Sequence, residues 1–109
     1  MTTPPLGELF KHAKVLQERF AQLQEELGRK TVEASSGGGM VTVVANGRQE
    51  VLSIRLDPQL LSSSGGSPDL PMLQDLITAA VNEAIRQARA MMADELKTLS
   101  GGVTLPGLF

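Results

Sequence analysis

The chain has 109 residues, with ten lysines and arginines against twelve aspartates and glutamates, and a formal net charge of −2 at pH 7. It has no cysteine and one histidine, His12, which excludes disulfides, thiolate metal sites and multi-histidine metal sites. Tryptophan and tyrosine are also absent, which argues against a nucleic-acid reader that stacks bases on aromatic side chains. The length and the 41% of apolar residues predict a single globular domain over residues 1–109.

The first predicted element is a helix over about residues 6–28. Apolar side chains recur there at alternating spacings of three and four residues, as Leu6, Leu9, Ala13, Leu16, Phe20, Leu23 and Leu27. Gly28 follows as the expected C-terminal stop. Such a helix would be about 34 Å long at 1.5 Å per residue.

Three antiparallel strands are predicted over about residues 31–56. The first covers residues 31–35, the second residues 40–45 and the third residues 48–56, where Leu52, Ile54 and Leu56 alternate on one face. Asn46-Gly47 predicts a two-residue type I′ turn in which both residues have positive φ. Asp57-Pro58 ends the third strand, because proline cannot donate to the ladder.

A flexible loop over residues 62–68 and a second helix over about residues 70–99 come next, before an irregular tail over residues 100–109. Ser67 or Asp69 is the expected N-cap of this helix, which would be about 45 Å long. Its apolar residues form one stripe at helical spacing, made of Leu73, Ile77, Ala80, Val81, Ala84, Ile85, Ala88, Met92, Leu96 and Leu99.

The predicted helices are too long for a compact monomer. A compact domain of this length has a radius of gyration of about 13 Å, and a three-stranded sheet has open edges and buries little alone. We therefore expect an α+β protomer that forms a homodimer with projecting helical arms. The side chains expected to pack the helices and the dimer are Leu9, Leu16, Phe20, Leu23, Ile77, Val81 and Ile85. The alternative is a monomer with frayed helix ends.

No residue pattern predicts an enzyme. Gly37-Gly38-Gly39 is followed by a strand rather than by a helix, so it predicts a turn with positive φ and not a phosphate-binding loop. His12 has no carboxylate placed by sequence to orient it, and a helix-surface position is expected. Asp94 and Glu95 are adjacent and point to different helix faces. We expect no catalytic residue, cofactor or metal.

Basic residues on the two helices are the remaining functional candidates. Acidic residues are interleaved with them, so a solvated, salt-bridged surface is the alternative interpretation. The candidates for contacts with a polyanion are Lys11, Lys14 and Arg19 on the first helix and Arg86 and Arg89 on the last.

Taken in order, several segments resemble the YbaB/EbfC family of small bacterial nucleoid-associated proteins. They are Ser36-Gly37-Gly38-Gly39-Met40-Val41, Asn46-Gly47, Val51, Ile54-Arg55-Leu56-Asp57-Pro58, Leu73-Gln74-Asp75-Leu76-Ile77, Ala79-Ala80-Val81-Asn82-Glu83-Ala84 and Pro106-Gly107-Leu108-Phe109. The resemblance implies an α-β-β-β-α protomer, a tight tweezer-like homodimer and binding to duplex DNA with little sequence preference. It also implies a role in nucleoid organisation or gene regulation. Asn82 lies in a matching segment, and packing, capping or DNA contact are all open for it.

Two functional classes follow. The first is a DNA-binding homodimer of the cytoplasm and nucleoid that contacts phosphates through its arms. The second is a structural or adaptor dimer that binds a protein partner in recombination or replication, so proteins of DNA metabolism are further candidate partners. No membrane partner is expected, because the chain has no run of about 20 apolar residues and no signal-peptide pattern.

Overall fold

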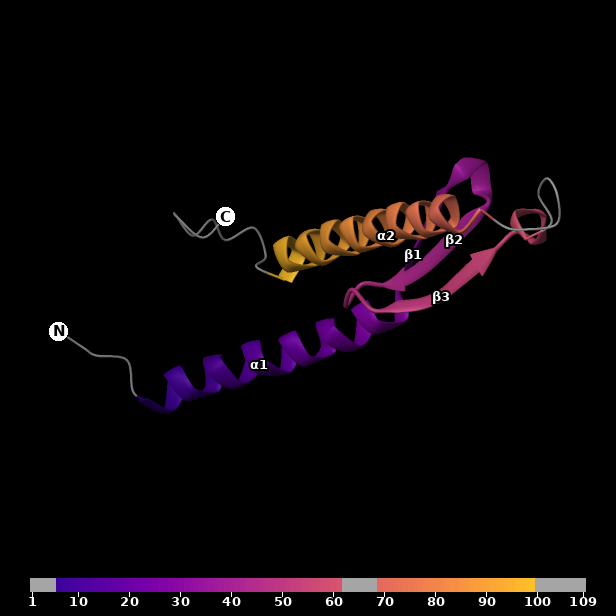
Figure 1. The fold of residues 1–109 in the computed structure, drawn as a ribbon. Helices are drawn as coiled ribbons and strands as arrows, with labels where there is room; N and C mark the ends of the chain where they lie inside the picture. Colours follow the sequence, from indigo (N-terminus) through magenta and orange to yellow (C-terminus); the bar gives the residue numbers. More distant parts are fainter. Residues whose placement is uncertain (1–5, 62–68, 100–109) are drawn as a thin grey trace.

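The computed structural model describes residues 6–61 and 69–99. The predicted α-β-β-β-α order and α+β class are confirmed (Figure 1). The predicted loop over residues 62–68 and the predicted tail over residues 100–109 lie outside the described residues. The elements in chain order are helix α1 (Leu6–Arg29), strand β1 (Thr31–Ser36), a 3₁₀ turn (Gly37–Gly39), β2 (Val41–Asn46), β3 (Val51–Leu56), a second 3₁₀ turn (Pro58–Leu60) and α2 (Leu70–Leu99).

The three strands form one antiparallel sheet in the order β1-β2-β3, so β1 and β3 are its edges. Val43 pairs with Ala34 of β1 on one side and with Ile54 of β3 on the other, which places all three side chains on one face. The glycines between β1 and β2 have φ of 62°, 69° and 93°, so the predicted positive-φ turn is confirmed.

Helix α2 lies across β1 and β2 and covers that face of the sheet (Figure 1). Asp69 caps its N-terminus by accepting a hydrogen bond from the Met72 N–H at 3.1 Å. Ala80, Ala84 and Ala88 are fully buried at successive turns, and their short side chains let the helix approach the sheet closely. The buried core beneath them consists of Ala34, Val41, Val43, Ala45 and Leu60. Strand β3 has few contacts with α2 and lies at the uncovered edge.

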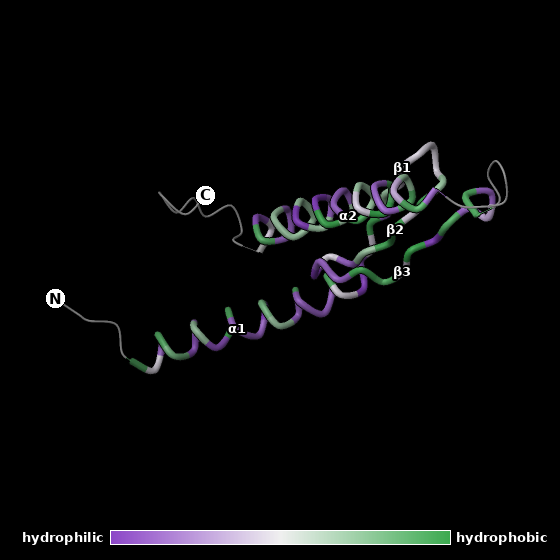
Figure 2. Tube along the Cα trace, in the orientation of Figure 1, coloured by the Kyte–Doolittle hydropathy of each residue, from purple (hydrophilic) through white to green (hydrophobic). Residues whose placement is uncertain are grey.

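Helix α1 runs away from the sheet, and only Leu23 and Leu27 among its residues are buried. Figure 2 shows hydrophobic positions recurring along its length, and the rest of the chain leaves most of them exposed. The radius of gyration is 21.1 Å, against about 13 Å for a compact domain of this length. Within the described residues, neither helix meets the length and hydropathy that crossing a membrane requires.

The turn between β2 and β3 differs from the prediction. Gln49 N–H donates to Asn46 O at 3.0 Å and Asn46 N–H donates to Glu50 O at 3.0 Å, so the loop has three residues, 47–49. Gly47 does not have positive φ, whereas Gln49 does, at 65°. A three-residue loop with a left-handed third residue is a standard alternative to the type I′ turn. Because Arg48 and Gln49 belong to the loop and Glu50 closes it, β3 begins at Val51 rather than at Arg48.

Gly47 is required for a different reason, which is its contact with α1. A Cβ atom at this position would lie 2.7 Å from Leu27 Cδ2 and 3.0 Å from Leu27 O. The Gly47 N–H donates to Leu27 O at 2.8 Å and to Lys30 O at 3.0 Å, so the turn caps the C-terminus of α1. Helix α1 ends at Arg29, one residue beyond the predicted end at about residue 28.

Candidate nucleic-acid interface

Helix α1 presents the first group of predicted DNA contacts. Lys11 and Lys14 are exposed on its outer half, and neither has an ion-pair partner among the described residues. His12 is exposed beside them, in a hollow that is also lined by Val15, Leu16 and Arg19. These lysines can approach a polyanion without first breaking an ion pair.

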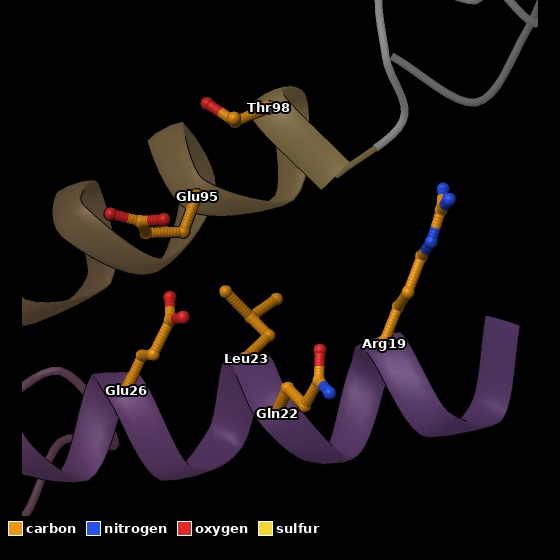
Figure 3. A pocket seen from close by; sticks show the side chains of 6 residues that line it. All are labelled: Arg19, Gln22, Leu23, Glu26, Glu95 and Thr98. Carbon is orange, nitrogen blue, oxygen red and sulfur yellow. The ribbon is translucent and has the colours of Figure 1, made fainter. Parts of the chain in front are cut away.

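Arg19 lies further along α1, at a groove between the two helices (Figure 3). The groove has a volume of about 250 Å³, and its lining residues are Arg19, Gln22, Leu23, Glu26, Glu95 and Thr98. Two carboxylates therefore share this groove with one guanidinium. That balance disfavours a phosphate between α1 and α2 of one chain.

An ion pair between Lys30 and Glu95 closes the inner end of the space between the helices. The hydrogen bond to Glu95 is the main reason that the pKa of Lys30 is raised, and the charges of Glu95 and Glu26 act in the same direction. The pair joins α2 to the residue that follows α1, 65 positions earlier in the chain. It therefore ties the C-terminal part of α2 to the base of α1.

Arg86 and Arg89 form the second group of predicted contacts, and both side chains are on the exposed surface of α2. Arg86 Nη2 is 2.9 Å from Glu83 Oε2 one turn earlier. Arg89 Nε donates to Gln49 Oε1 at 3.1 Å, which links α2 to the β2–β3 turn. Arg86 is thus partly neutralised by its own helix, whereas Arg89 binds only a neutral amide among the described residues.

The turn itself carries a further arginine, Arg48, held by a dense set of hydrogen bonds. Asn46 is buried, and its Oδ1 accepts from the N–H groups of Arg48 at 3.0 Å and of Glu50 at 3.1 Å. Asn46 Nδ2 donates to Glu50 Oε1 at 2.8 Å, and Arg48 Nη2 is 3.0 Å from the same oxygen. The bond from Asn46 and the charge of Arg48 lower the pKa of Glu50. The Arg48 guanidinium also lies over Gly28 in the last turn of α1.

The five predicted contacts do not form a single cluster. Lys11 and Lys14 lie on the outer half of α1, Arg19 lies at the groove, and Arg89 lies at the β2–β3 turn. The sequence analysis named neither Arg48 nor Gln49, which lie at the turn that Arg89 contacts. The only signal for Arg48 was that it is a basic residue in a predicted hairpin turn. Nothing in the sequence linked Gln49 to Arg89, 40 positions away.

The apolar residues predicted to pack the helices and the dimer differ in exposure. Leu23 is buried, and Ile77, Val81 and Ile85 are half-buried along one flank of α2. Leu9, Leu16 and Phe20 are 53%, 59% and 49% exposed, so the rest of the chain does not cover them. Within the described residues, no group of three or more histidine, aspartate or glutamate side chains is arranged to hold a metal ion.

The chain is similar to known proteins both in sequence and in fold. Residues 3–103 match the model of the YbaB/EbfC DNA-binding family. A nucleoid-associated protein of Syntrophobacter fumaroxidans is 52% identical over 98 residues, covering 90% of this chain and 86% of that one. One of Acidobacterium capsulatum is 49% identical over 106 residues, covering 95% of each chain. The crystal structure of an uncharacterised Helicobacter pylori protein matches with a TM-score of 0.64 and 26% identity, over 94% of this chain and 96% of that one.

Proposed function

Because this chain belongs to the YbaB/EbfC DNA-binding family, we propose that it binds duplex DNA as a homodimer, through phosphate contacts and with low sequence specificity. The family comprises nucleoid-associated DNA-binding proteins and is not a family of enzymes. The role that follows is nucleoid organisation or gene regulation, in the cytoplasm and nucleoid. The proposal rests on the family match over residues 3–103, and the exposed lysine and arginine side chains of the two helices support it.

Lys11 and Lys14 are the first contacts that we propose. They are exposed on a helix that extends away from the sheet, and the described residues neutralise neither of them. Arg19, Arg86 and Arg89 are the further candidates. Contacts to phosphates position a protein on DNA but carry no sequence information directly, which accounts for low specificity.

The homodimer is proposed from two surfaces that the protomer leaves open. The first is the apolar face of α1, which includes Leu9, Leu16 and Phe20. The second is strand β3, which is an open sheet edge with Leu52 and Ile54 54% and 46% exposed. Exposed edge strands and contiguous apolar surface favour association. A second copy of the chain offers the same two surfaces and could cover both.

The test compares charge-neutralised variants in a fluorescence anisotropy titration of a labelled duplex. Lys11→Gln combined with Lys14→Gln should weaken binding to unrelated duplex sequences by the same factor. For each phosphate that the variant no longer neutralises, the slope of log affinity against log salt concentration should become shallower by about 0.9. Arg55→Gln is the matched control, because it removes a charge away from both helices and on the face of β3 opposite the exposed Ile54. Unchanged binding by the double variant would remove these lysines from the interface.

The adaptor function remains the second candidate because of the exposed apolar face of α1. Under that proposal the chain still forms a dimer, and the part of this face that the dimer leaves exposed binds a protein of DNA metabolism. A dimer in sedimentation velocity that fails to bind duplex DNA at low salt would favour the adaptor function over the DNA-binding homodimer.

A further inference from the structure

The β2–β3 turn contains a backbone conformation that its sequence does not favour. Gln49 has φ of 65°, and it is the only residue other than glycine with positive φ in the described parts of the chain. Glycine adopts this conformation without strain, whereas glutamine pays a steric penalty. Such outliers cluster at functional sites, where the surrounding structure holds the strained residue in place.

What the strained residue does is visible in its side chain. Gln49 Oε1 accepts the hydrogen bond from Arg89 Nε at 3.1 Å. When a guanidinium is held through Nε, its two Nη groups remain free to donate in parallel. Two parallel N–H donors match the geometry of a phosphate, which they can bind with two hydrogen bonds. Arg89 is exposed and has no ion-pair partner among the described residues. A glycine at position 49 would remove both the strain and this orienting contact.

A second arginine lies at the same turn. Arg48 precedes Gln49 in the chain, and its side chain is about half exposed. Two carboxylates also lie at this junction. Glu50, which is bound to Asn46, pairs with Arg48 and partly neutralises it, and Glu95 is bound to Lys30. The turn is fixed to α1 through the Gly47 N–H, so a firmly held loop carries both Arg48 and Gln49, the residue that Arg89 of α2 contacts.

We propose that Arg89 and Arg48 form a phosphate-contact site at the β2–β3 turn, with Gln49 as the residue that positions Arg89. This inference rests on the proposed binding of duplex DNA and adds a contact region to it. The site is separate from Lys11 and Lys14. Gly28, beneath Arg48, is 14 residues from Lys14 along α1, or about 21 Å at 1.5 Å per residue. Phosphates of one strand repeat at about 3.4 Å along the duplex axis, so a duplex lying along α1 can reach both regions.

The experiment uses the full chain and a labelled duplex of random sequence, with affinity from anisotropy and stability from thermal unfolding. Arg89→Gln and Arg48→Gln should each weaken binding by roughly tenfold, the scale of one charge-assisted hydrogen bond. Arg89→Gln should also make the slope of log affinity against log salt concentration shallower by about 0.9 for each phosphate contact that is lost. Gln49→Gly should weaken binding several-fold while leaving the melting temperature equal or higher, because it relieves the strain. Arg55→Gln serves as the charge control.

A double variant separates positioning from a general effect on the turn. If Gln49 acts through Arg89, adding Gln49→Gly to Arg89→Gln should weaken binding no further. If Gln49→Gly weakens DNA binding by the same factor in the unaltered protein and in the Arg89→Gln variant, Gln49 does not act by positioning Arg89. Unaltered affinity of both Arg89→Gln and Arg48→Gln, when the unaltered protein binds, would overturn the site and leave the proposed function standing. Failure of the unaltered protein to bind duplex DNA at low salt would overturn both.

Discussion

At the residue scale, Gly47 fixes the direction of helix α1, because its lack of a side chain lets the β2–β3 turn pack directly against that helix. Its Cα lies so close to the last turn of α1 that a Cβ atom would meet Leu27 O at 3.0 Å and Leu27 Cδ2 at 2.7 Å. The side chain of Leu27 can move, but its backbone oxygen is held by the hydrogen bond from Gly47 at 2.8 Å. The turn and the helix therefore depend on each other.

Gly47→Ala should lower the free energy of unfolding by about 1–3 kcal/mol, the usual cost of overpacking. Urea denaturation followed by circular dichroism measures the change. Gly7→Ala is the matched control, because its Cβ would meet nothing within 4 Å and alanine favours a helix, so stability should be equal or slightly higher. Equal stability of Gly47→Ala and the unaltered protein would show that the turn does not pack on α1 as described.

The residue scale is also where prediction from the sequence was weakest. The bond between Arg89 and Gln49 joins positions 40 apart, and the pair of Lys30 and Glu95 joins positions 65 apart. Periodicity reports which face of a helix is apolar, but it does not report which long side chain reaches a distant turn. The sequence therefore supplied Arg89 as a candidate on charge alone and did not supply Arg48 or Gln49.

At the element scale, the short side chains of α2 set its distance from the sheet. Ala80, Ala84 and Ala88 are fully buried against β1 and β2, so a larger side chain at the middle position has no space to enter. Ala84→Leu should destabilise the protein by about 1–3 kcal/mol. Ala90→Leu adds the same atoms at an exposed position and should leave stability nearly unchanged. Chemical denaturation of the two variants compares them directly, and equal stabilities would contradict this packing.

The elements themselves were largely predictable. Both helices and all three strands were expected near their observed positions, because the heptad-like spacing of α1 and the β-branched run of β2 are strong local signals. The errors fall at the turn. Asn46-Gly47 favours a type I′ turn locally, but the contact of Gly47 with Leu27 and the caps from Asn46 stabilise a longer loop. Helix α1 ends at Arg29, one residue past Gly28.

At the scale of the whole molecule, the extended shape leaves surfaces that we propose a second copy covers. Replacing Leu52 and Ile54 with glutamate would place charges on the exposed apolar face of β3 and should shift the protein from dimer to monomer in sedimentation velocity. Ser53→Glu adds a charge on the opposite face of the same strand and should leave the dimer intact. A dimer that persists in the Leu52 and Ile54 variant would exclude this face of β3 from the interface.

We propose that a homodimer of this chain binds duplex DNA through phosphates without sequence preference. The most direct test is the affinity of the unaltered protein for two duplexes of unrelated sequence, measured by anisotropy over a range of salt concentrations. We predict similar affinities for both duplexes, falling steeply and in parallel with salt, with a log–log slope of about −0.9 per phosphate contacted. Binding confined to one duplex, or an affinity that does not change with salt, would contradict the account.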